Sequence, residues 1–289
     1  MAELKKQLQE YLLTMRAPVE TAGSPYSSRN SSKGALLNES EIVFSYLAKN
    51  NCNLASARNA VIRDNILAKR TYQTRKRCWA VLHSRYFPAC VPRTGRPNKF
   101  ADGHLNPIIA IYKTNASETM RRGALYYHFA TSDLFTYEVT TRLIYSLIHK
   151  GFTNISPRII DDFLDSRAES HPEINNWSYQ TRKSLISHYL SALRDFGILE
   201  GKVRKRIHRP IVEETLFLYV ATVLRDCGKS SRDILASDDF KLFLLTPAEV
   251  EIRFIEAHRN KRIEFRKSGK IISLEFPWET IHDYIKTLE

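Results

Sequence analysis

The pattern with the clearest chemical meaning in this 289-residue sequence is a short polar and basic repeat. Residues 71–76, Thr-Tyr-Gln-Thr-Arg-Lys, return 107 residues later at 178–183 as Ser-Tyr-Gln-Thr-Arg-Lys. Apolar residues follow both copies in one register: Cys78, Trp79, Leu82 and Tyr86 after the first, and Leu185, Ile186, Tyr189 and Leu193 after the second. Each copy therefore predicts a helix with a hydroxyl N-cap, one buried face and one polar face.

Such a polar face has the residue types of a DNA recognition helix, whose first turns present long hydrogen-bonding side chains to base edges. Gln can pair with adenine, Arg with guanine, and Lys with phosphates. The candidate contacts of the first copy are Lys69, Arg70, Gln73, Arg75, Lys76 and Arg77. Those of the second copy are Gln180, Arg182 and Lys183. The alternative explanation is a capped surface helix with ordinary basic residues.

The distribution of charge favours an anionic partner. The chain carries 44 Lys and Arg against 31 Asp and Glu, a net charge of +13. Eleven basic residues and one acid, Asp64, lie between Arg58 and Lys99, so this segment alone contributes +10. Because a solvated surface normally mixes both signs, this concentration indicates nucleic acid.

Two further basic segments follow the predicted helices. After the second helix, Lys202, Arg204, Lys205, Arg206 and Arg209 predict a wing that contacts backbone phosphates. After the first, Arg93 and Arg96 flank a glycine in a Gly-Arg-Pro sequence similar to a minor-groove hook. An ordinary basic linker explains that second segment more simply, since Thr94 stands where the hook has arginine.

The sequence offers no signature of an enzyme. It contains none of the patterns GxxxxGK[ST], GxGxxG, GxSxG or HExxH, and its four cysteines form no CxxC pair. We interpret Asp161, Asp162 and Asp165 as residues in the first turns of a helix that follows Ser156-Pro157, where their negative charges would complement the helix dipole. We therefore expect no catalytic residue, no metal and no cofactor.

Hydrophobic periodicity predicts a mainly α fold with small β additions, in which two helix-turn-helix or winged-helix-like modules are joined by a helical block. The predicted segments are an N-terminal helix with a Ser-rich linker (1–33), a basic module (34–97), the helical block (98–150), and a winged-helix-like module with a C-terminal α+β portion (151–289). The aromatic residues of the block are interpreted as core. The longest apolar run, 216–224, is too short to span a bilayer, and Glu3 and Glu10 argue against a secretory leader, so we expect a cytoplasmic protein.

The segment 177–210 resembles the BrxA family of bacteriophage exclusion (BREX) defence systems. The similarity lies in Trp177-Ser178, Thr181, Lys183, the helix end Leu193 to Leu199, and Arg209-Pro210, and it extends to Gly34–Glu39 in the first module. This resemblance covers about residues 30–287. It implies a non-enzymatic, mainly helical, nucleic-acid-binding protein of phage resistance that works beside a methyltransferase, an ATPase and a phosphatase-like protein.

Three functions therefore compete. The first is double-stranded DNA binding in phage defence. The second is RNA binding of an antitermination-factor type, which the repeat disfavours because a recognition helix enters the major groove of B-DNA but not that of A-form RNA. The third is an adaptor whose basic faces hold acidic partner proteins.

Overall fold

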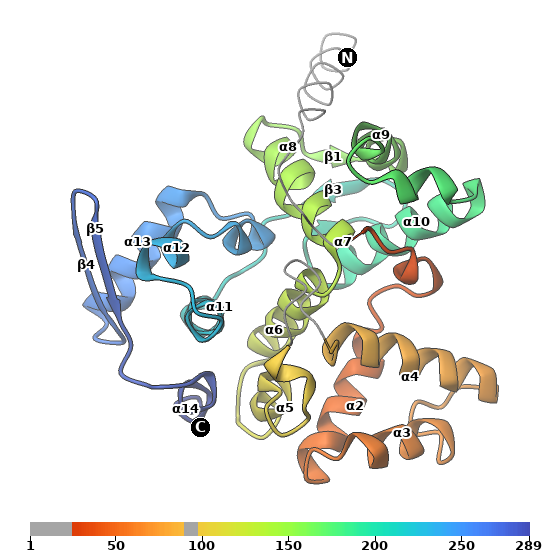
Figure 1. The fold of residues 1–289 in the computed structure, drawn as a ribbon, viewed down its shortest axis with the longest axis horizontal. Helices are drawn as coiled ribbons and strands as arrows, with labels where there is room; N and C mark the ends of the chain where they lie inside the picture. The colour runs from red at the N-terminus through yellow and green to blue at the C-terminus, as the bar shows by residue number, and fades with distance from the viewer. Residues whose placement is uncertain (1–24, 90–97) are drawn as a thin grey trace.

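The computed structural model describes residues 25–89 and 98–289, and this part of the chain is mainly helical, with two small antiparallel sheets (Figure 1). The prediction of a mainly α fold with small β additions is confirmed. No helix in the described ranges has the length and apolar character needed to cross a membrane.

The first group of helices follows the order expected for a helix-turn-helix module. It consists of α2 (Leu37–Lys49), α3 (Leu54–Ile62) and α4 (Tyr72–Tyr86). Helix α3 is capped by Asn53, whose side chain accepts a hydrogen bond from the Ser56 amide at 2.9 Å. Helix α4 begins directly after the predicted cap residue Thr71. Helix α3 packs against both α2 and α4.

The central block connects the two repeated helices. It contains η2 (Lys99–Ala101), α5 (Pro107–Ile111), α6 (Glu118–Thr131), α7 (Leu134–Glu138), the π-helical segment η3 (Val139–Ile144) and α8 (Tyr145–His149). Its aromatic residues Tyr126, Tyr127, Phe129, Phe135 and Tyr137 are buried. The interpretation of these aromatics as core is confirmed.

The second repeated helix lies in a unit that also contains a three-stranded sheet. The elements are β1 (Asn154–Ile155), α9 (Pro157–Arg167), η4 (Pro172–Asn176), α10 (Tyr179–Asp195), β2 (Leu199–Glu200) and β3 (Lys205–Ile207). Strand β3 lies between β1 and β2 and is antiparallel to both. Gly201 has a φ of +87°, and an added Cβ would lie 2.1 Å from the Arg204 carbonyl oxygen, so the tight turn between β2 and β3 requires glycine.

The remaining elements form the C-terminal α+β portion. They are α11 (Glu214–Asp226), α12 (Ser231–Leu235), η5 (Asp238–Phe243), α13 (Pro247–Arg259), β4 (Glu264–Ser268), β5 (Ile271–Glu275) and α14 (Ile281–Lys286). The apolar run 216–224 is the buried body of α11, which packs against α6, α13 and α14. Strands β4 and β5 pair with each other as an antiparallel hairpin.

A segment at 25–35, here called the strap, lies between the two repeated helices. Its helix η1 (Arg29–Ser32) packs on α10, and Figure 1 shows it passing from α10 towards α2 and α4. Arg85 of α4 is only 3% exposed and donates to the Asn30 side chain and to the carbonyl oxygens of Lys33, Gly34 and Ala35 at 2.7–3.1 Å. One positive charge of the basic segment 58–99 is therefore buried, and its hydrogen bonds hold the strap in place.

Candidate nucleic-acid interface

The two repeated helices begin in the same way. The Thr71 hydroxyl accepts a hydrogen bond from the Thr74 amide at 3.1 Å and lies 2.9 Å from the Thr74 hydroxyl. The Ser178 hydroxyl accepts from the Thr181 amide at 3.1 Å and lies 2.9 Å from the Thr181 hydroxyl. Both predicted N-caps are confirmed with matching geometry.

The two helices also bury the same register. The apolar residues that were predicted to correspond are all 7% exposed or less: Cys78, Trp79, Leu82 and Tyr86 in α4, and Leu185, Ile186, Tyr189 and Leu193 in α10. Gln73 and Gln180 lie on the opposite, exposed faces. The repeat is therefore three-dimensional: caps, cores and polar faces correspond.

Each helix starts with an exposed tyrosine that was not among the predicted DNA contacts. Tyr72 is 51% exposed and Tyr179 is 77% exposed. The Nζ atom of Lys76 lies 5.5 Å from the Tyr72 ring centroid, and Nζ of Lys183 lies 5.9 Å from the Tyr179 ring centroid. The signal was available in the sequence, because the tyrosine is one of the identities within the repeat.

The repeated arginine turns towards the preceding helix in both copies. Arg75 donates from Nη1 to the Arg63 carbonyl oxygen at the end of α3, at 3.3 Å. Arg182 donates from Nε to Asp161 at 2.9 Å and from Nη2 to Asp165 at 2.7 Å, both on α9. In this arrangement Arg75 and Arg182 join helices rather than extend into solvent.

The acidic cluster has a different role from the expected one. Helix α9 has no acid in its first turn, so the interpretation of Asp161, Asp162 and Asp165 as complements of the helix dipole at its start is wrong. Asp161 and Asp165 accept hydrogen bonds from Arg182, and Asp162 lies 3.9 Å from Arg158. No three His, Cys, Asp or Glu side chains within the described ranges are placed to bind a metal.

Of the other predicted DNA contacts of the first module, one lysine is paired with an acid and three cations are not. Lys69 donates to Glu39 at 2.5 Å, and this hydrogen bond raises the pKa of the lysine. Arg70, Lys76 and Arg77 are exposed and form no ion pair with another described residue. These three charges, at and just before the start of α4, are exposed to solvent.

The hairpin between β2 and β3 provides the second group of cations. Its Lys202, Arg204 and Arg206 are exposed, and Val203 between them is 95% exposed. Lys205 donates to the Lys202 carbonyl oxygen at 2.9 Å, and Arg206 lies 3.8 Å from Glu200. Arg209, in contrast, pairs with Glu249 of α13 at 2.6 Å and so ties this unit to the C-terminal portion.

The candidates Arg93 and Arg96 lie outside the described residues, so the proposed hook is not placed. The candidates that remain exposed are the starts of α4 and α10, each with a Gln, a Lys and a Tyr, and the hairpin, which lines one groove together with α10. These segments present cations, amides and aromatic rings. Such groups can bind phosphates and contact bases.

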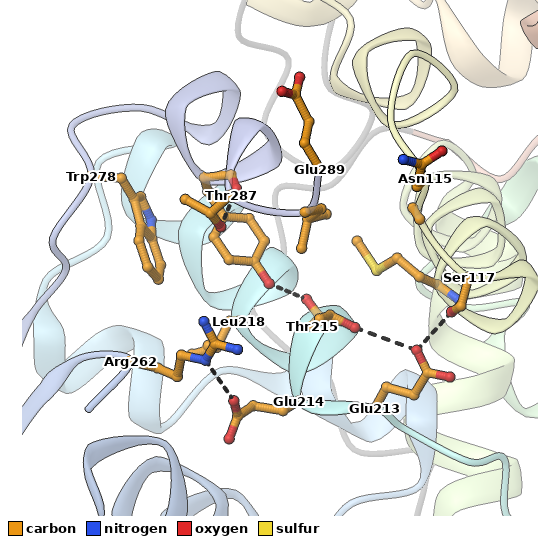
Figure 2. A pocket seen from close by; sticks show the side chains of 14 residues that line it. Asn115, Ser117, Glu213, Glu214, Thr215, Leu218, Arg262, Trp278, Thr287 and Glu289 are labelled. Carbon is orange, nitrogen blue, oxygen red and sulfur yellow. Dashed lines mark hydrogen bonds and ion pairs between the residues drawn. The ribbon is translucent and has the colours of Figure 1, made fainter. Parts of the chain in front are cut away.

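A separate pocket of about 220 Å³ lies where α6, α11 and α14 meet (Figure 2). Several of its polar side chains are paired with neighbouring groups. Glu213 accepts hydrogen bonds from Ser117 and Thr215, Glu214 pairs with Arg262, and the Tyr284 hydroxyl donates to the Thr215 carbonyl oxygen. Among the described residues that line this pocket there is no histidine or cysteine.

Comparison with known proteins agrees with the resemblance seen in the sequence. No protein with a curated description matches the chain. The family model described as BrxA matches residues 24–223, from the strap through most of α11. This match covers well over half of the chain, which therefore belongs to the BrxA family of components of BREX phage-defence systems.

Proposed function

We propose that this protein binds double-stranded DNA through the starts of α4 and α10 and through the hairpin at 201–206, as a non-enzymatic component of its BREX system. The observation that carries the proposal is the three-dimensional repeat. Two helices share one cap geometry, one buried register and one exposed Tyr-Gln-Lys face. Two such helices give a protein two sites at which it can hold one duplex.

The topology around α10 supports the same proposal. The order α8, β1, α9, α10, β2, β3, with β3 between the other two strands, is the arrangement of a winged helix. In that interpretation α10 is the recognition helix and 201–206 is the wing. The wing's exposed lysines and arginines would bind phosphates beside the groove that α10 enters.

The contacts support a division of the candidates into residues that we propose bind DNA and residues that hold the fold. Arg70, Lys76, Arg77, Lys183, Lys202 and Arg204 are the cations that we assign to phosphates, and Gln73 and Gln180 are assigned to base edges. Arg75, Arg182, Lys69 and Arg209 are held by groups of the protein itself. We assign these four to positioning rather than to DNA contact.

We propose that the protein acts in the cytoplasm and has no catalytic activity of its own. It would act together with the methyltransferase, ATPase and phosphatase-like proteins of a BREX system. Co-purification of the tagged protein with these partners, in the presence and absence of nuclease, tests the context. Retention of the partners after nuclease treatment, together with failure to bind DNA, would favour the adaptor function instead.

The decisive experiment is a salt titration of duplex DNA binding. In the parent protein, log affinity should fall linearly with log salt, with about −0.9 in slope for each phosphate contacted. Replacing Arg70, Lys76 and Arg77 together by Ala should weaken binding and flatten the slope by up to about 2.7. Circular dichroism should be unchanged, because all three side chains are exposed.

A matched control removes the same charge elsewhere. Arg259, Lys261 and Lys270 are exposed residues of the α13–β5 region, and their joint replacement by Ala should change the slope little. Equal effects of the two triple variants would mean that binding follows net charge alone. Parent-like DNA binding by the α4 variant would contradict the assignment of that helix.

A further inference from the structure

An open groove lies between α10 and the proposed wing. Its volume is about 410 Å³, and its lining comes from β1, the start of α9, α10 and the 203–205 hairpin. The floor is apolar, because Ile155, Ile186 and Leu190 contribute to it and are themselves almost fully buried. The ring of Tyr179 and the side chain of Val203 stand at its sides and are the most exposed large apolar groups of this unit.

The rim of the groove is basic. Arg158, Lys183 and Lys205 line it, together with Arg182, whose charge is shared with Asp161. Asp161 is the only acid in the lining. A ligand that fits therefore combines a flat or apolar group, which lies on the floor, with negative charge at the rim.

A base-paired duplex supplies the charge but not the flat group, because its bases are stacked and their faces are covered. An unpaired base supplies both, since its open face can stack on an aromatic ring and its flanking phosphates meet the cations. Tyr179 is well suited to such stacking because 77% of its surface is open. Lys183, one helical turn later, lies over that ring and can move to a phosphate.

We propose that this groove binds an unpaired nucleobase of DNA, with Tyr179 as the stacking residue and Lys183 and Lys205 as the phosphate contacts. The proposal rests on the proposed function in one respect, that DNA lies against α10 and the wing. It adds a substrate class: duplex DNA that carries an unpaired nucleotide, as at a junction between duplex and single strand.

The test compares three DNAs with the same duplex. One is blunt, one carries a single-stranded tail, and one carries a tail of the same length with abasic nucleotides. The two tails have equal numbers of phosphates, so any difference between them reports the base. We expect the parent protein to bind the normal tail about tenfold more tightly than the abasic tail. A 2-aminopurine in the tail should be quenched on binding.

Matched variants assign the effect to the groove. Tyr179→Ala should abolish the preference for the normal tail and the quenching, whereas Tyr179→Phe should keep both because it retains the ring. Tyr72→Ala removes the equivalent tyrosine of α4 and should leave the preference unchanged. The ratio of the affinities for the normal and the abasic tail is compared within each variant, so any change in blunt-duplex affinity cancels from the comparison.

The results separate this proposal from the proposed function. Equal affinity for normal and abasic tails, or a preference that survives in Tyr179→Ala, overturns the groove assignment while duplex binding still stands. Absence of binding to any of the three DNAs overturns both. An acidic peptide whose binding is lost in Tyr179→Ala, with no effect of the base, would identify the groove as a protein-docking site and the proposal as wrong.

Discussion

The guanidinium of Arg182 joins α10 to α9 through Asp161, with Nε donating to the carboxylate at 2.9 Å and Nη2 donating to the backbone carbonyl oxygen of the same residue at 3.2 Å. Arg75, at the corresponding position of the repeat, joins α4 to the end of α3. The acceptors differ, but in both copies the repeated arginine donates a hydrogen bond to the preceding helix or its end. It therefore ties each exposed helix to its neighbour.

Replacing Arg182 by Met should lower stability and leave DNA binding nearly intact. The side chain is 21% exposed and its carboxylate partners are more open, so solvent screening limits the loss to about 1 kcal/mol. Urea unfolding measures this loss, and the slope of the salt titration measures DNA contact. Lys183→Met is the control on the same helix and should show the reverse pattern. If Arg182→Met flattened the slope of the salt titration without lowering stability, Arg182 would contact DNA, contrary to our assignment.

Local signals were sufficient to predict much of the fold. Thr71 and Ser178 predicted the starts of α4 and α10 because a hydroxyl cap is a strong local preference. The buried registers followed from helical periodicity. The elements that were missed are short or irregular: the two-residue strand β1, the five-residue helix α12 and the π-helical segment η3. Two to six residues carry too little periodicity to identify.

The candidate site was harder to predict because side-chain pairing is a tertiary property. The acidic partners are distant in the sequence: Glu39 lies 30 residues from Lys69, Asp161 lies 21 residues from Arg182, and Glu249 lies 40 residues from Arg209. Charge density and helical spacing contain no information on those partners. For the same reason the sequence counted Arg85 as part of a basic surface, although it is buried under the strap.

Replacing Arg85 by Met should be strongly destabilising. The guanidinium satisfies the Asn30 side chain and three backbone carbonyl oxygens of the strap, and it lies against the ring of Phe129. Loss of a donor to several buried acceptors should cost about 2–4 kcal/mol in unfolding free energy. Burial lowers the pKa of Arg85 to about 10, so the group is still charged at neutral pH. Arg77→Met, an exposed change on the same helix, serves as the reference, and equal unfolding midpoints would show that the strap is held by other contacts.

Removing the two N-cap hydroxyls should have equal effects, since their geometries match. Thr71→Ala and Ser178→Ala should each lower the free energy of unfolding by about 1 kcal/mol, because an amide in the first turn loses its acceptor. Thr71→Ser should retain nearly full stability, as the hydroxyl is kept. Thermal denaturation of the three variants measures the effect. A clear loss at one cap and none at the other would argue that the two helix starts are not equivalent.

Stability should also depend on pH through His128. Its Nε2 lies 2.7 Å from the hydroxyl of the buried Tyr219, and burial lowers the pKa of the imidazole to about 4. The unfolded chain binds the proton near the ordinary value of about 6.5, so the unfolded state holds more protons between the two values. The stabilising contribution is therefore complete above about pH 6.5 and is lost progressively as the pH falls towards 4. Unfolding free energies measured from pH 7.5 to 4 should show this decline, and His128→Gln, which can keep a hydrogen bond to Tyr219 without titrating, should show a shallower one. Parallel pH curves for the two proteins would mean that titratable groups other than His128 account for the pH dependence.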